Sequence, residues 1–162
     1  MANAVPAVPD DMHTLTPYLI CEGAAAAIDY YAHAFGAVEV ARLPAPNGLI
    51  MHAMVRIGDS ALMLSDAMPE WGMPGARALK GSPVFIHQYV EDVDAVFARA
   101  LAAGGREIMP VQDMFWGDRY GQLEDPFGHR WSIATHKEDL SPDDIARRMA
   151  AAGADGGCGQ PG

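Results

Sequence analysis

Apolar positions along this chain fall into two kinds of segment, short apolar runs beside turns and longer stretches with helical spacing. Residues 49–57 and 60–66 are short, largely apolar runs on either side of a Gly58-Asp59 turn, which is typical of two paired strands. Residues 23–35 instead carry apolar side chains at helical spacing, and Gly36 ends that pattern. These patterns predict a helix over residues 23–35 and strands over residues 49–57 and 60–66.

One order of elements occurs twice, at an offset of about 68 residues. Gly36 falls on Gly104, and Glu39 falls on Glu107. The first copy reads strand, helix and three strands, over residues 13–21, 23–35, 37–43, 49–57 and 60–66. The second copy repeats that order, over residues 83–90, 92–103, 106–111, 112–124 and 129–135. The pattern predicts an α+β protein made of two βαβββ modules.

The stretch 125–131, Asp-Pro-Phe-Gly-His-Arg-Trp, predicts a hairpin tip before the last strand. Pro126 presets φ, and Gly128 can take a positive φ. Further on, Ser141 and Pro142 are typical of a helix start. The expected organisation is an arm, a first module, a linker or lid, a second module, a C-terminal helix region and a disordered tail, over residues 1–12, 13–66, 67–82, 83–136, 137–152 and 153–162.

Composition and net charge disfavour a membrane-spanning or nucleic-acid-binding protein. Half of the residues are hydrophobic, and no run approaches the roughly 18 apolar residues that a membrane span needs. The net charge of −10 disfavours binding to nucleic acid or to an anionic membrane surface. No signal peptide is visible, and Cys21 and Cys158 are not expected to form a disulfide. We therefore expect a cytoplasmic protein.

The repeated unit, closed by the motif at 125–131, resembles the vicinal oxygen chelate superfamily, which includes glyoxalase I, bleomycin resistance proteins and extradiol dioxygenases. Thr16-Pro17-Tyr18-Leu19, together with the ending at 131–139, is similar to its PhnB-like branch. The resemblance covers residues 13–140. It implies a curved, mixed eight-stranded sheet around a cleft, and it implies a homodimer.

Metal-dependent members of that superfamily hold a divalent ion with His and Glu side chains from four strands. By resemblance, the corresponding positions here are Thr16, Leu64 or Ser65, Phe85 and Ser132. None of these is a good ligand for zinc, nickel, iron or manganese. We therefore expect no cofactor, and a divalent metal would need a displaced site.

Period two predicts which side chains line the cleft. If Phe85 takes the ligand position of the family, His87 lies on the same face. His87 is then either a polar contact or general acid/base, or a half-buried hydrogen-bonded histidine. The expected ligand-binding residues are Tyr18, Phe85, His87, Trp116, Tyr120, Arg130 and Ser132. Such a surface suits a flat ligand with an acceptor or anionic group.

Three functions remain open from the sequence. The first is a module that binds a small organic molecule in an aromatic-lined cleft. The second is an enzyme of the same superfamily, a lyase, isomerase or dioxygenase, that uses a displaced metal site or His87 as acid/base. The third, methyltransferase activity, follows only from an older name of the PhnB-like branch. The chain lacks the glycine-rich strand-loop-helix that a methyl-donor cofactor would need.

Overall fold

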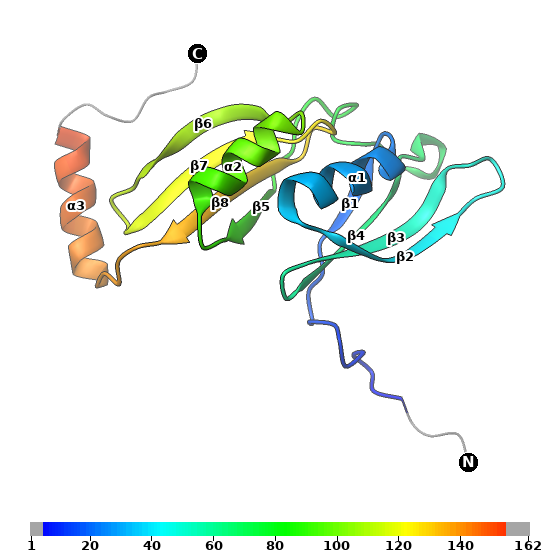
Figure 1. Cartoon of the computed structure of the whole chain (residues 1–162), viewed down its shortest axis with the longest axis horizontal. Coiled ribbons are helices and arrows are strands. Elements are labelled where there is room, and N and C mark those ends of the chain that lie inside the picture. The colour runs from blue at the N-terminus through cyan, green and yellow to red at the C-terminus, as the bar shows by residue number, and fades with distance from the viewer. Residues whose placement is uncertain (1–4, 155–162) are drawn as a thin grey trace.

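The computed structural model describes residues 5–154, and its eight strands form two mixed sheets of four (Figure 1). The first module runs β1 (Tyr18–Cys21), α1 (Ala24–Phe35), β2 (Val38–Pro44), β3 (Ile50–Ile57) and β4 (Ser60–Asp66). The second runs β5 (Phe85–Tyr89), α2 (Val93–Ala102), β6 (Arg106–Asp113), β7 (Asp118–Glu124) and β8 (Arg130–His136). A C-terminal helix, α3 (Pro142–Ala154), follows. The predicted α+β fold with two βαβββ modules is confirmed.

Strand order is the same in the two sheets, β1-β4-β3-β2 and β5-β8-β7-β6. In each, the first strand of the module pairs parallel with the last, and the other pairs are antiparallel. No hydrogen-bonded ladder joins the sheets within the described part of the chain, so the strands do not form one continuous eight-stranded sheet. Strands β1 and β5 are each an edge strand of their own sheet.

One core joins the two modules. Helices α1 and α2 are in contact and lie on the same side of the two sheets (Figure 1). Trp131 on β8 packs against Phe35 of α1, with ring centroids 4.3 Å apart, and against Tyr31 at 5.3 Å. Because these contacts cross the module boundary, the burial of large aromatic rings holds the modules together. No helix in the described part of the chain covers the opposite face of either sheet.

The predicted hairpin tip at 125–131 is confirmed. Gly128 has φ 90°, and its N–H donates to the Asp125 carbonyl at 3.1 Å. The Asp125 carboxylate accepts from the N–H groups of Phe127 and His129, at 2.9 and 3.0 Å. His129 is buried, and its Nε2 lies 3.0 Å from the Ile20 carbonyl. This turn therefore contacts β1 of the other module.

Several boundaries differ from the sequence prediction. The first strand begins at Tyr18 instead of His13, because Pro17 has no N–H for a ladder and pairing with β4 starts at Tyr18. Residues 112–124 are divided by a turn after Asp113 and before β7. The linker contains a short 3₁₀ helix, η1 (Pro69–Trp71). Cys158 and most of the predicted tail lie outside the described residues, as does the start of the arm.

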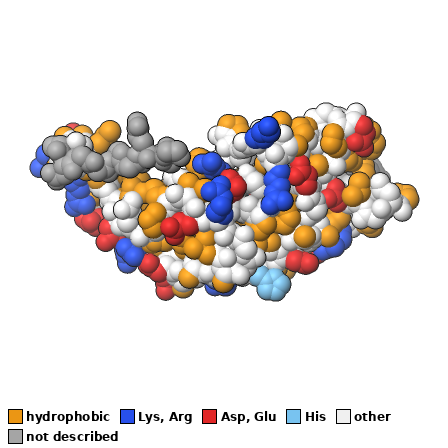
Figure 2. All heavy atoms as spheres, turned by 90° about the horizontal axis from the view of Figure 1, so that it is seen from above, with side chains coloured by type: hydrophobic (Ala, Val, Ile, Leu, Met, Phe, Trp, Pro, Cys, Tyr) orange, Lys and Arg blue, Asp and Glu red, His pale blue; other side chains and the backbone are white. Residues whose placement is uncertain are grey.

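The surface shows no concentration of positive charge on the face seen in Figure 2, where acidic and basic side chains are interspersed among apolar ones. Among the described helices, none combines the length and apolar character required to cross a membrane.

Candidate functional site

One side of the second sheet faces away from the helices, and we call this side the open face of β5–β8. Its side chains are arranged in rows across the strands. Trp131 and Ile133 of β8 are buried toward the helices, so Ser132 points the other way. The strand register then sets three rows across the sheet. These rows are Phe85–Arg130–Glu124, His87–Ser132–Gln122 and Tyr89–Ala134–Tyr120.

His87 lies in the middle row. Its Nδ1 lies 2.7 Å from the Ser132 hydroxyl, which fixes the ring, and its Nε2 has no hydrogen-bond partner among residues 5–154. Tyr89 meets the imidazole edge to face at 4.6 Å, and Tyr120 stacks on it at 6.1 Å between centroids. Partial burial lowers the pKa of His87, against a smaller opposing effect of Asp118. His87 is therefore neutral at pH 7.

A second group of polar side chains is arranged around Asp118, which is 5% exposed. Its carboxylate accepts from Trp116 Nε1 at 3.1 Å and from the Tyr89 hydroxyl at 3.2 Å. His136 bridges two carboxylates, with Nδ1 2.9 Å from Asp118 and Nε2 2.9 Å from Asp139. Hydrogen bonds to Asp139 and Asp118 raise the pKa of His136. This network fixes the aromatic rings of Trp116 and Tyr89.

The structure brings six of the seven expected ligand residues together. Five lie on β5, β7 and β8 of the open face, and Trp116 joins them from the turn before β7, with its ring 5.3 Å from that of Tyr120. Arg130 lies beside Glu124, 3.8 Å from its carboxylate. Tyr18 is separate: it lies on the first sheet, where its hydroxyl is 3.0 Å from His52 Nδ1.

Sequence reasoning missed Tyr89, Asp118 and Gln122. Period two from His87 could have identified Tyr89, because the two residues are two positions apart on one strand. The pairing of Asp118 with His136 depends on the register of β7 against β8. A sequence alone does not provide that register.

The side chains present do not fit a divalent metal of the superfamily's usual kind. Ser132 is hydrogen-bonded to His87, and Phe85 offers only hydrocarbon. Thr16 lies before β1 and is not in a strand. Within residues 5–154 there is no cluster of three or more His, Cys, Asp or Glu side chains arranged to hold a metal ion.

Two residues with potential nucleophilic chemistry are inaccessible. Ser132 is 3% exposed, so it positions His87 and does not present its hydroxyl to a substrate. Cys21 is fully buried, with its Sγ 3.7 Å from His129 Nε2. Burial raises the pKa of the Cys21 thiol to about 12, so it stays protonated at neutral pH.

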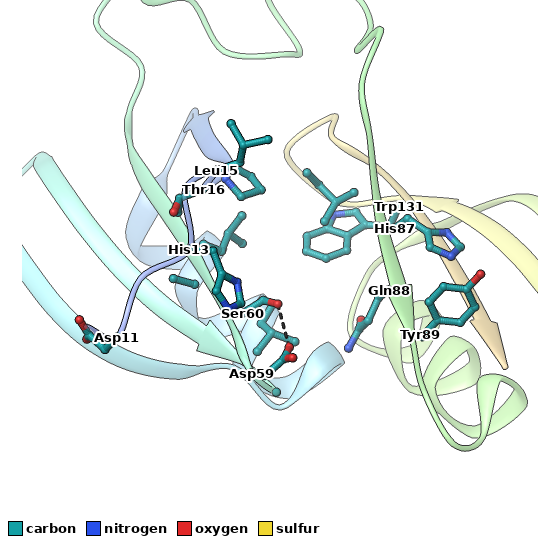
Figure 3. Close-up of a pocket in the computed structure, with 16 residues that line it drawn as sticks. Asp11, His13, Leu15, Thr16, Asp59, Ser60, His87, Gln88, Tyr89 and Trp131 are labelled. Carbon is teal, nitrogen blue, oxygen red and sulfur yellow. Dashed lines mark hydrogen bonds between the residues drawn. The ribbon is translucent and has the colours of Figure 1, made fainter. Parts of the chain in front are cut away.

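A cavity of about 560 Å³ lies between the modules, on the other side of β5. Its wall includes the β3–β4 turn and residues that precede β1. Figure 3 shows Gln88 and Trp131 projecting into it, whereas His87 and Tyr89 project from β5 in the opposite direction. Strand β5 therefore separates the cavity from the open face.

Known proteins share both the sequence and the fold. The uncharacterized protein Rv0887c of Mycobacterium tuberculosis is 44% identical over 144 residues, which cover 86% of this chain and 84% of that protein. Protein PA1353 of Pseudomonas aeruginosa is 29% identical with a TM-score of 0.65, covering 78% of this chain and 99% of its own.

Two further solved structures share the fold at lower identity. A PhnB protein from Bacillus cereus is 20% identical, with a TM-score of 0.62 over 76% of this chain and 99% of its own. TnmS3 from Streptomyces sp. CB03234, an antibiotic binding protein, is 23% identical, with a TM-score of 0.59 over 77% of this chain and 96% of its own. Residues 12–133 match the family described as Glyoxalase/Bleomycin resistance protein/Dioxygenase superfamily. The chain belongs to this superfamily, with PhnB-like proteins among its structural neighbours.

Proposed function

We propose that this protein binds a small, flat organic molecule on the open face of β5–β8, without a metal ion. The observation that carries this proposal is the set of aromatic rings around His87, namely Tyr89, Tyr120 and Trp116. Their orientations are fixed by hydrogen bonds, because Tyr89 and Trp116 both donate to the buried carboxylate of Asp118. Such a surface offers stacking together with one fixed polar contact at His87 Nε2.

Exposure of this surface supports the proposal. Phe85 is 42% exposed and Tyr89 is 61% exposed, although both are large and apolar. Exposed aromatic side chains that share one face are typical of interaction sites. TnmS3 shows that an antibiotic binding protein can have this fold.

The experiment is a ligand screen followed by a matched pair of variants. Planar aromatic fragments are screened by ligand-observed NMR, and the Kd of the best fragment is measured by calorimetry. His87→Ala is expected to raise that Kd by about 5- to 30-fold, corresponding to one lost hydrogen bond of ~1–2 kcal/mol. The control is His33→Ala, which removes an exposed imidazole on α1.

Two results contradict the proposal. One is an unchanged Kd in His87→Ala. The other is a fragment whose chemical-shift changes fall outside the open face of β5–β8.

A second candidate is an enzyme that uses His87 as a general acid/base. The lowered pKa of His87 favours it, since a base must be unprotonated at the working pH. Turnover of the bound molecule that follows the His87 pKa, and that disappears in His87→Ala while binding persists, is the expected result for this candidate. Binding without turnover favours the first.

We also propose that two copies associate and that the open faces of their sheets take part in the contact. The first sheet also has a face turned away from the helices. No helix within residues 5–154 covers either of these faces, and each exposes large apolar side chains, such as Phe85 and Leu43. Association would cover this surface and enclose the ligand site.

A further inference from the structure

The cavity between the modules differs from the open face in position and chemistry. One wall consists of apolar side chains that face the helices or the module boundary, including Trp131, Leu62 and Ile86. Its volume of about 560 Å³ is within the range of pockets that hold small organic molecules. His87 and Tyr89 contribute to its boundary only from β5, since their side chains point away (Figure 3).

The charged groups at this cavity are acidic. Asp11 and Asp59 belong to its lining, and no lysine or arginine is among the described residues that line it. Arg56 compensates Asp11, with its Nη2 3.5 Å from the Asp11 carboxylate. Asp59 has no ion-pair partner within residues 5–154, and its carboxylate accepts only from Ser60, at 2.8 Å. Arg56 also donates to the Asp59 backbone carbonyl, at 3.5 Å. The two carboxylates at the rim therefore face one arginine and leave an excess of one negative charge.

A second observation indicates the same ligand chemistry. Oε1 of Gln88 is buried and has no hydrogen-bond donor among the described residues. The Gln88 side chain extends into the cavity toward Asp59 (Figure 3). An acceptor without a donor is unfavourable in a buried position. Turning the amide so that Oε1 faces the cavity would let a ligand N–H group remove that penalty.

We propose that this cavity is a second binding site, which takes a small organic ammonium ion with an apolar body. The ammonium group lies at the Asp59 carboxylate, toward which the Gln88 side chain extends. The apolar body lies against Trp131, Leu62 and Ile86. An anionic ligand is disfavoured here, because Asp11 and Asp59 carry one more charge than the Arg56 beside them.

Three probes with the same apolar body test this site: 4-phenylbutylamine, 4-phenylbutanol and 4-phenylbutyrate. Each is titrated into the full-length protein, and backbone amide shifts at 58–62 and 86–89 are followed by NMR. The amine is expected to bind about fivefold more tightly than the alcohol, as for a partly exposed ion pair, and the carboxylate more weakly than both.

Variants distinguish the contribution of the Asp59 charge to binding from that of the apolar body of the ligand. Asp59→Asn is expected to remove the difference between amine and alcohol while leaving the alcohol's Kd unchanged. Asp143→Asn, the same change on the distant α3, leaves the preference intact. Gln88→Glu adds a carboxylate and is expected to strengthen amine binding. His87→Ala, which tests the open face, is expected to leave the Kd of the amine unchanged. The two proposals can therefore be tested separately.

Three results overturn the proposal: equal affinity for the three probes, shift changes confined to other parts of the protein, or no binding of any probe at millimolar concentration. A lysine side chain of a peptide carries the same ammonium group. Tighter binding of Nα-acetyl-lysine methylamide than of 4-phenylbutylamine would overturn the assignment to a small apolar amine.

Discussion

Asp125 connects the two modules through a single carboxylate. Besides the two N–H groups of its own turn, it accepts from the Tyr31 hydroxyl at 2.7 Å and from Trp131 Nε1 at 3.0 Å. Tyr31 belongs to α1 of the first module, and Trp131 to β8 of the second. All of these groups are buried, so each depends on Asp125 for its hydrogen bond.

Asp125→Ala is therefore expected to lower the free energy of unfolding by about 3–5 kcal/mol, since several buried donors lose their acceptor together. Urea denaturation followed by circular dichroism measures the change. Asp29→Ala, an exposed position on α1, serves as the control and is expected to change stability little. A loss below about 1 kcal/mol in Asp125→Ala would contradict this role.

The pKa values of His87 and His136 are expected to lie on opposite sides of the ordinary value of 6.5. Burial lowers the pKa of His87, so its contribution to stability is lost as pH falls from 6.5 through its folded pKa. The carboxylates of Asp139 and Asp118 raise the pKa of His136, so its contribution is present below 6.5 and is lost as pH rises through its folded pKa.

An NMR titration of the imidazole protons measures both values. Asp139→Asn is expected to lower the pKa of His136 and to leave that of His87 unchanged. The assignment of these environments is wrong if the two histidines titrate together.

At the residue scale, sequence reasoning identified side chains that share a strand. Phe85 and His87 lie on one face because strand geometry has a period of two, and no tertiary information is needed for that. Tyr18 was expected beside them but lies on the first sheet. Its placement depends on how the modules pack, which the period of a strand does not determine.

The two module helices begin with different N-terminal partners. At α2, Asp92 caps its own helix, accepting from the Ala95 N–H at 3.0 Å. At α1, the preceding residue is Gly23, which offers no side chain, and Asp66 at the end of β4 accepts from the N–H groups of Gly23 and Ala24. Asp66 also accepts from Ile50 at 2.7 Å, so one carboxylate joins α1, β3 and β4.

The same substitution at the two positions should therefore have unequal effects. Asp92→Ala is expected to cost about 1 kcal/mol, as for other N-caps. Asp66→Ala leaves three buried or half-buried N–H groups without an acceptor and is expected to cost about 2–4 kcal/mol. Parallel urea denaturation of the two variants measures the difference, and equal losses would contradict the interpretation.

This contrast also shows which elements the sequence could predict. The Asp92 cap and the Ser141 start of α3 depend on neighbouring residues, and both are confirmed: the Asp144 N–H donates to the Ser141 hydroxyl at 3.2 Å. Asp66 acts on a helix start 42 residues earlier in the chain, which local patterns do not reveal. The start of β1 was wrong for a similar reason, since it depends on where β4 pairs with it.

At the scale of the whole molecule, each sheet has one face that α1 and α2 do not cover. The helices cover one side of both sheets, and the other side exposes Phe85 and Tyr89 in one module and Tyr18 and Leu43 in the other. Large exposed apolar side chains that share a face are typical of protein interfaces. A homodimer that covers these faces stays a prediction of this architecture.

Analytical ultracentrifugation at micromolar concentration is expected to give twice the chain mass of 17.3 kDa. Phe85→Glu places a charge on the open face of β5–β8 and is expected to raise the dimer dissociation constant by at least about tenfold, or ~1.4 kcal/mol. Ala98→Glu adds the same charge to an exposed position on α2, on the helical side, and should leave the dimer unchanged. A parent protein of single-chain mass rules out the dimer, and a Phe85→Glu variant that dimerises like the parent removes this face from the contact.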